Sequence, residues 1–288
     1  MKILIWLFIL VYMYIYIRER YRIAKITSSY KRILKVPDKL YNIPPICHQT
    51  WGTKKLSTGI RRIMNNNKLL NLNMKFKLYD DVECHNYIRD NFSSPIYRAY
   101  MKINPKYGAV KADFFRYCIL YNEGGIYLDI KSGFTCKIFG NIITPEDICI
   151  LDTKKKIRNF IEWRDVLKYR THEQWLLMFC KGHNYLKTMI DLMVEMIENY
   201  KEPPSFGLST TISTKISLQK ERVLRLTGPD AFSVAIHKSI IFHGIQHREV
   251  DYNSIAKLEP VKNLKDELYS KTKNTHYSIV TESLIIDL

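Results

Sequence analysis

Apolar and polar residues divide the 288-residue chain into three blocks. The first is an unbroken apolar and aromatic run at residues 3–17. From residue 43 to about residue 135, strand-like and helix-like patterns alternate, which favours a mainly parallel sheet flanked by helices. In the third block, apolar residues recur at helical spacing from Asn184 to Tyr200 and predict a helix. The pattern predicts an α/β domain that follows an apolar N-terminal segment.

The N-terminal run predicts a membrane anchor. A helix of this length covers only about 22 Å of a hydrocarbon core of about 30 Å, so the run is short for a span. Three tyrosines near its end fit an interfacial belt. A cleaved signal peptide is the alternative, but no small-residue cleavage site follows the run. We expect a single-pass membrane protein with a transmembrane or signal-anchor helix at residues 1–17, a basic stem at residues 18–42 and the main domain at residues 43–288.

Charge bears on location and on partners. More basic residues follow the apolar run than precede it, so the positive-inside rule puts the main domain in the cytoplasm. The net charge of +17 at pH 7 indicates either attraction to an anionic lipid surface or a phosphorylated small molecule, or simply a lysine-rich solvated surface. A nucleic-acid partner is not expected, because neither zinc-finger spacing nor an RNA-binding motif accompanies the charge.

Residues 111–131 carry the most information about function. The first part predicts a helix on which Asp113 and Arg116, three residues apart, project from one face. Gly124 and Gly125 predict a turn in which two stretches of backbone approach closely.

The second part of this segment, residues 126–131, predicts an extended strand. Side chains alternate along a strand, so Tyr127, Asp129 and Lys131 are expected on one face. An acid and a base at the carboxyl end of a buried strand are typical of a binding or catalytic site.

Three other segments add to this pattern. Residues 43–52 predict a proline-bounded strand that contains His48 and leads to Trp51. Residues 76–81 predict a strand with an acidic end, and residues 226–232 carry a Thr-Gly-Pro sequence.

In their residue types and in their order along the chain, these four segments resemble the glycosyltransferases with a DXD sugar-binding motif. That group includes yeast-type initiating mannosyltransferases and the mannosyltransferases of inositol phosphorylceramide, with the catalytic domains of clostridial glucosylating toxins as more distant relatives. Their shared core is an Asp, an Arg three residues later, and then Gly-Gly-x-Tyr-x-Asp-x-Asp. Lys131 stands here where the second Asp of the motif belongs.

The resemblance implies a GT-A type nucleotide-sugar-binding fold of the α/β class. It also implies a membrane-anchored retaining glycosyltransferase that moves a hexose, of the mannosyl or glucosyl type, from a UDP- or GDP-sugar to a glycan or glycolipid acceptor. Eukaryotic members usually place this domain in the secretory lumen. That is the opposite side of the membrane from the cytoplasmic side that the positive-inside rule predicts.

Site residues follow from the same resemblance. The expected catalytic residues are Asp129, Lys131 and Arg116. The expected donor-binding residues are Trp51, whose ring would stack on the base, together with His48, Asp113, Arg116, Tyr127 and Asp129. For His48, a structural role in the core is an equal alternative.

The cofactor prediction is a divalent metal, Mn²⁺ by resemblance, with Asp129 as its protein ligand. The metal would neutralise the departing diphosphate, and Mn²⁺ favours carboxylate and water ligands. A protonated lysine cannot ligate a cation. Lys131 therefore leaves three hypotheses open. In the first, Lys131 neutralises the diphosphate itself. In the second, Asp129, other acids and the donor phosphates hold the metal. In the third, the chain is an inactive relative.

Two alternatives to an enzyme also stay open. A non-catalytic protein on the same fold would bind a sugar nucleotide or a glycan without turnover. A basic adaptor would use only its stem and charge at a membrane surface. Residues 172–175, a polar and aromatic cluster, are expected either to line the acceptor side or to begin a helix.

Overall fold

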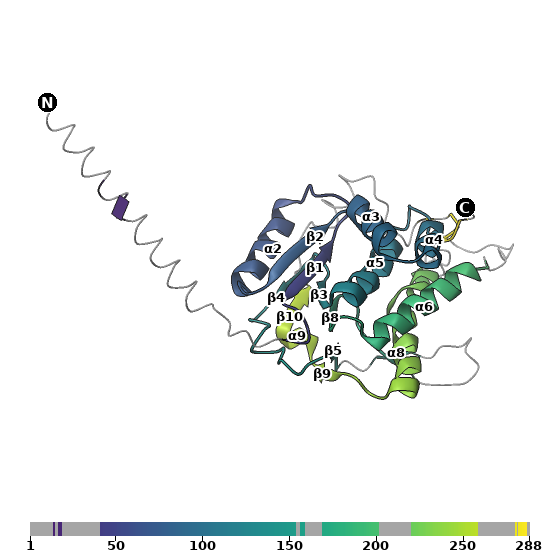
Figure 1. Ribbon diagram of the computed structural model, residues 1–288. Helices are drawn as coiled ribbons and strands as arrows, with labels where there is room; N and C mark the ends of the chain where they lie inside the picture. The colour runs from purple at the N-terminus through teal and green to yellow at the C-terminus, as the bar shows by residue number, and fades with distance from the viewer. Residues whose placement is uncertain are drawn as a thin grey trace, which may run out of the picture. The chain divides into compact units, whose positions relative to one another are not determined.

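The computed structural model describes residues 14, 17–18, 41–153, 156–158, 169–201, 220–258, 280 and 282–286. The fold lies in the compact unit Tyr41–Leu288, whose main sheet has six strands in the order β2-β1-β3-β8-β5-β9 (Figure 1). These strands are β1 (Ile46–Thr50), β2 (Lys75–Tyr79), β3 (Gly125–Leu128), β5 (Cys149–Asp152), β8 (Leu176–Phe179) and β9 (Arg248–Val250). Two small sheets pair β4 (Ser132–Phe134) with β10 (Ala256–Leu258), and β6 (Lys156–Arg158) with β7 (Tyr169–Thr171).

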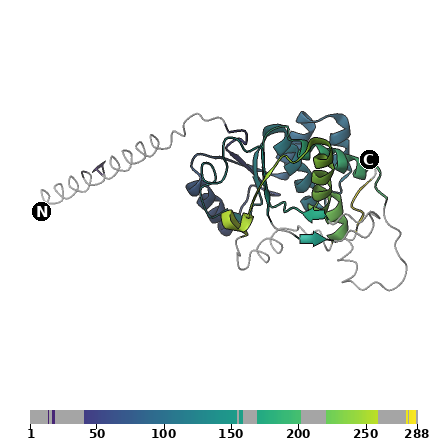
Figure 2. The same ribbon diagram turned by 90° about the horizontal axis from the view of Figure 1, so that it is seen from below.

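Helices lie on both sides of the main sheet. In Figure 1, α2 lies beside β2 and β4, whereas α5, α6 and α8 are grouped on the other side. Figure 2 shows the same division, with the dark blue α2 and the yellow-green α9 together and the teal and green helices opposite them. The helices with described bounds are α2 (Thr58–Leu70), α3 (Asp81–Asn91), α4 (Ser94–Lys102), α5 (Gly108–Glu123), α6 (Asn184–Glu198), α8 (Pro229–His243) and α9 (Tyr252–Ile255).

The predicted α/β class with a parallel-rich sheet is confirmed. β1 is parallel to β2 and to β3, and β5 is parallel to β9. β8 is antiparallel to both of its neighbours, β3 and β5, which the alternating pattern did not predict. The sheet is therefore mixed, and its parallel part is the one that carries the predicted motifs.

The strands β3, β5 and β8 are buried on both faces, because successive side chains alternate and both sets are covered. One set packs in the larger core with the helices α3, α4, α5, α6 and α8: Tyr127, Cys149, Leu151, Leu177 and Phe179. The other set packs in a second core with α9 and the segment that follows β4: Ile126, Leu128, Ile150, Leu176 and Met178. The helix predicted at residues 184–200 is confirmed as α6, which packs in the larger core.

The predicted two-glycine turn joins α5 to β3. Gly124 and Gly125 have φ angles of 68° and 98°, in the region that favours glycine. A Cβ on Gly125 would lie 2.5 Å from the carbonyl oxygen of Ile46. The turn therefore allows β3 to approach β1 closely, as predicted.

The predicted strand at residues 126–131 is too long by three residues. β3 ends at Leu128, and the amide of Asp129 still donates to the Trp175 carbonyl at 2.8 Å. The amide of Ser132 then donates to the Asp129 carbonyl at 2.8 Å and closes a turn. Ile130 packs in this turn against Ile60 and Met64 of α2, so burial of its side chain bends the chain away from the sheet.

The predicted membrane localisation requires correction. In the described ranges, no helix is long and apolar enough to cross a membrane. The longest, α5, has 16 residues, which reach about 24 Å, and it contains charged side chains. This finding contradicts the single-pass prediction. Apart from Tyr14 and Ile17, the expected anchor lies outside the described residues, as does the expected stem at residues 18–42 except for Arg18, Tyr41 and Asn42.

We expect Gly125→Ala to lower the free energy of unfolding by about 2–4 kcal/mol, because it combines a left-handed φ with a backbone clash. Urea denaturation measures the effect. Gly108→Ala is the matched control, because its new Cβ meets nothing within 4 Å. Gly108→Ala should leave the free energy of unfolding unchanged or raise it by at most about 1 kcal/mol. Equal losses of stability in the two variants would contradict the argument that β3 approaches β1 too closely for a side chain at position 125.

Candidate active site

Most of the predicted site residues lie near the carboxyl ends of three parallel strands. β1, β2 and β3 run in one direction, and Trp51, Asp80 and Asp129 directly follow them. This edge of an α/β sheet is where binding sites commonly form. Asp80 has a local role, since it caps α3 in a reciprocal arrangement with Glu83.

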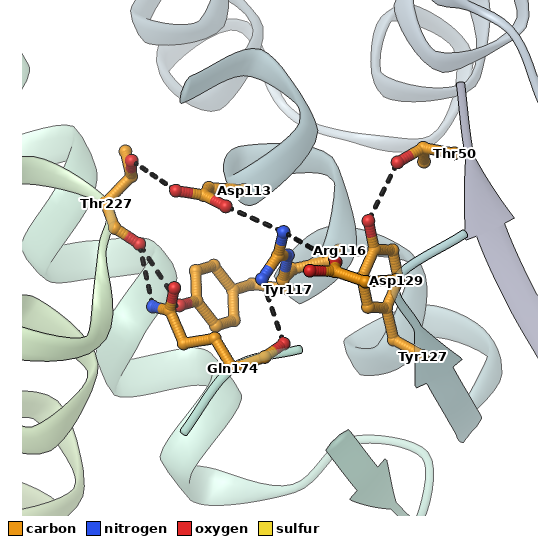
Figure 3. A network of polar contacts seen from close by, with 8 residues as sticks. All are labelled: Thr50, Asp113, Arg116, Tyr117, Tyr127, Asp129, Gln174 and Thr227. Carbon is orange, nitrogen blue, oxygen red and sulfur yellow. Dashed lines mark hydrogen bonds and ion pairs between the residues drawn. The ribbon is translucent and has the colours of Figure 1, made fainter. Parts of the chain in front are cut away.

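Arg116 lies at the centre of a buried polar network (Figure 3). Its Nη2 pairs with Asp113 Oδ1 at 2.8 Å and lies 3.4 Å from Asp129 Oδ1. Its Nη1 donates to the Gln174 carbonyl at 2.9 Å. Burial acts to lower the pKa of Arg116, but the carboxylates of Asp113 and Asp129 raise it above its ordinary value. The guanidinium therefore stays charged.

Asp113 is held from two sides. Arg116 contacts one of its oxygens, and the Thr227 hydroxyl donates to Oδ2 at 3.0 Å. Burial raises the pKa of the Asp113 carboxyl to about 6, against the opposing effects of Arg116 and Thr227. At pH 7 this carboxyl is mostly ionised and can serve as the partner of Arg116.

A second group of contacts ties distant parts of the chain to this pair. The Gln174 amide donates to the Thr227 carbonyl at 3.0 Å and also contacts the Tyr117 hydroxyl. That hydroxyl donates to the Thr227 carbonyl at 3.2 Å. Thr227 thereby joins α5 and the β7–β8 connection to the start of α8 (Figure 3).

Asp129 is the open carboxylate of the network. Its side chain is 38% exposed, whereas that of Arg116 is 9% exposed. Burial raises the pKa of Asp129, while Arg116 and Lys131 oppose the rise. Because more than a third of this side chain faces solvent, water weakens the effect of burial.

Tyr127 lines the network from β3. Its ring centre lies 4.5 Å from Cζ of Arg116, a cation–π contact. Its hydroxyl is 2.8 Å from the Thr50 hydroxyl at the end of β1 (Figure 3). The network thus brings together four of the predicted site residues: Asp113, Arg116, Tyr127 and Asp129.

His48 lies in the core of the domain. It is 0% exposed, and burial lowers its pKa to about 4, so the ring is neutral at pH 7. Nε2 donates to the Gly124 carbonyl at 3.1 Å, and Nδ1 accepts from the Tyr79 hydroxyl at 3.2 Å. His48 therefore connects β1 to the glycine turn, which agrees with the structural alternative.

Trp51 directly follows β1 at the same sheet edge. It is half-buried and packs against the small cluster of Ile60, Met64 and Ile130. This places it beside the turn that carries Lys131, and its stacking role stays a prediction.

The described residues of the site do not fit a metal ion held by the protein. Asp113 is already bound by Arg116 and Thr227, and Asp129 shares Arg116. In the part of the chain that the structure describes, no group of three or more His, Cys, Asp or Glu side chains is placed to hold a metal. The whole sequence contains no Asp-x-Asp.

Three network residues had no predicted site role: Thr50, Tyr117 and Thr227. Gln174 belongs to residues 172–175, which the sequence predicts either to line the acceptor side or to begin a helix. Gln174 and Thr227 lie in segments that the sequence analysis singled out, but nothing local indicated their partners. Residues 172–175 form no helix. They connect β7 to β8, and Trp175 packs beside Tyr252.

A comparison with known proteins matches the segment of chain that carries Asp113, Arg116, Tyr127 and Asp129. Residues 53–149 match the family model described as "Glycosyltransferase sugar-binding region containing DXD motif". This match confirms the predicted resemblance for that part of the chain, and it supports the predicted class of enzyme, a glycosyltransferase.

Two curated relatives match similar lengths of chain. An uncharacterized glycosyltransferase of Acanthamoeba polyphaga mimivirus is 37% identical over 90 residues, which are 31% of this chain and 35% of that protein. Inositol phosphoceramide mannosyltransferase 2 of Schizosaccharomyces pombe is 33% identical over 91 residues, 32% of this chain and 26% of that protein. The chain therefore matches only about a third or less of each relative.

One similar solved structure is the UDP-bound glycosyltransferase domain from the YGT toxin. It is 9% identical, and the match covers 75% of this chain and 80% of that chain with a TM-score of 0.49. A likeness at this level does not assign the fold, which is described above from its own strands and helices.

We expect Thr227→Val to lower the free energy of unfolding by about 1.5–3 kcal/mol, since it removes a buried hydrogen bond to a carboxylate without changing side-chain size. Urea denaturation at pH 7.5 measures the loss, with Thr227→Ser as the matched control that keeps the hydroxyl. A valine variant as stable as the serine variant would show that the Asp113 contact contributes nothing.

Proposed function

We propose that the protein is a retaining glycosyltransferase of the GT-A fold that transfers a hexose from a UDP- or GDP-sugar to a glycan or glycolipid acceptor. The observation that carries the proposal is the pairing of the buried Arg116 with Asp113 and Asp129 at the carboxyl edge of the sheet. All three residues lie in the segment that matches the sugar-binding region. The mannosyltransferase name of one relative supports a hexose donor, and retention rests on the resemblance alone.

Donor binding would involve the network directly. Asp113 and Arg116 would hold hydroxyls of the donor sugar. Tyr127 and Asp129 would contact the sugar or the ribose, and Trp51 would stack on the base. His48 would act only indirectly, by holding the glycine turn.

Transfer requires a positive charge beside the leaving group. As the bond from the sugar C1 to the diphosphate breaks, negative charge develops on the departing oxygen. Mn²⁺ is the cation expected from the resemblance, but among the described site residues Asp129 would be its one open carboxylate ligand. No step of the transfer is therefore assigned to a metal.

A second candidate function is a sugar-nucleotide-binding protein without turnover. The absence of any Asp-x-Asp in the sequence favours it. Saturable donor binding with neither hydrolysis nor transfer, with and without Mn²⁺ and across a panel of glycan and glycolipid acceptors, would support this candidate over the enzyme.

We expect hydrolysis of a UDP- or GDP-sugar by the full chain, and we expect Asp129→Asn and Arg116→Lys each to reduce it at least about 100-fold. Each substitution removes an interaction with the donor while keeping the side chain close to its original size. Release of nucleoside diphosphate measures the rate. Asp191→Asn, an exposed acid on α6, is the matched control and should retain full activity.

If Asp191→Asn and Asp129→Asn lost activity equally, the assignment of the site would be wrong. Full activity in Arg116→Lys would exclude Arg116 from donor binding.

The rate should also depend on the protonation of Asp113. Its pKa is raised to about 6, so lowering the pH through 6 neutralises the carboxyl and removes the main ion pair of Arg116. We expect kcat/KM for donor hydrolysis to fall on the acid side with an apparent pKa of about 6. The hydrogen bond from Thr227 stabilises the ionised form of Asp113 and so lowers its pKa. Thr227→Val removes that bond and should shift the apparent pKa upward. A profile unchanged by the substitution would contradict this assignment.

A further inference from the structure

Position 131 lies in a turn whose backbone is fixed on both sides. Before it, Ile130 is buried against Ile60 and Met64 of α2. After it, the Ser132 amide is bonded to the Asp129 carbonyl at 2.8 Å, and Ser132 begins β4. The Lys131 side chain is half-buried and close enough to Asp129 to influence its pKa. The structure therefore holds the base of this side chain beside the open carboxylate.

The charges in this region indicate what Lys131 can replace. Asp113, Arg116 and Asp129 together carry one net negative charge, and Lys131 makes the group neutral. An aspartate at position 131 would give two net negative charges, and one divalent cation would be needed to reach the same neutrality. A lysine without metal and an aspartate with a divalent cation are therefore electrostatically equivalent here.

We propose that the Lys131 ammonium occupies the role of the divalent cation, pairing with the diphosphate of the donor so that donor binding and transfer need no metal. This inference rests on the proposed function. An ammonium is a point charge with three N–H donors, which suits phosphate oxygens. It cannot ligate a metal, and it repels one placed beside it.

The reaction balances with this assignment. The acceptor hydroxyl oxygen forms a bond to C1 of the sugar, while the bond from C1 to the diphosphate breaks and its electron pair stays on the departing oxygen. The acceptor proton passes to that oxygen. Lys131 remains protonated throughout and stabilises the charge that develops on the diphosphate.

Binding of UDP and GDP to the full chain tests the proposal. Isothermal titration calorimetry in EDTA and then in Mn²⁺ should give binding in both conditions, with dissociation constants within about threefold for the better nucleotide. Lys131→Ala should weaken metal-free binding at least about tenfold. Lys131→Asp should abolish it and regain binding only with Mn²⁺, whereas Lys131→Arg should keep it.

Two controls separate charge from folding. Lys187→Ala removes an exposed lysine on α6 and should bind as the unsubstituted protein does. The titration of the unsubstituted protein requires no variant, so binding that needs Mn²⁺ there overturns the proposal even if Lys131→Asp does not fold. Lys131→Ala and Lys131→Arg then test whether the charge comes from this side chain.

The outcomes separate this proposal from the function on which it rests. Binding that requires Mn²⁺ in the unsubstituted protein, or unchanged metal-free binding in Lys131→Ala, would overturn the role of Lys131 and leave the glycosyltransferase proposal standing. If neither nucleotide bound in either condition, both proposals would be wrong.

Discussion

The burial of one guanidinium group organises this site. Arg116 lies on a helix whose residues from Asp113 to Leu120 are all buried, and a buried charge is costly unless it is paired. Asp113, Asp129 and the Gln174 carbonyl provide that pairing. Because these partners come from a helix, a strand end and a distant connection, satisfying the charge also fixes the relative positions of those three elements.

The glycine turn determines where the pairing takes place. It lets β3 lie close to β1, and His48 reinforces the contact through the Gly124 carbonyl. Asp129 then emerges at the sheet edge that also carries Thr50 and Trp51. One carboxylate faces solvent beside a buried positive charge, which suits the binding of a polar ligand. The half-buried Lys131 extends this polar region from the neighbouring turn.

Local pattern was sufficient for much of the fold. The helix, the glycine turn and the start of β3 could be predicted, because helical spacing and glycine torsion preferences act within a few residues. The end of β3 could not be predicted in this way. Asp129 and Lys131 alternate as strand residues do, but burial of Ile130 against α2 and the bond from Ser132 to Asp129 make a turn instead. Those partners become visible only in three dimensions.

By itself, the sequence determined the α/β class and the shared helix face of Asp113 and Arg116, because these follow from local spacing. The family resemblance of the central segment added the prediction that Asp113, Arg116, Tyr127 and Asp129 form the site. Only the tertiary structure decided that Thr227 and Gln174 complete the network. It also showed His48 in the core and β8 antiparallel to its neighbours. The physical reason is that a buried polar group needs a partner wherever the folded chain can supply one, and Thr227 is more than a hundred residues from Asp113.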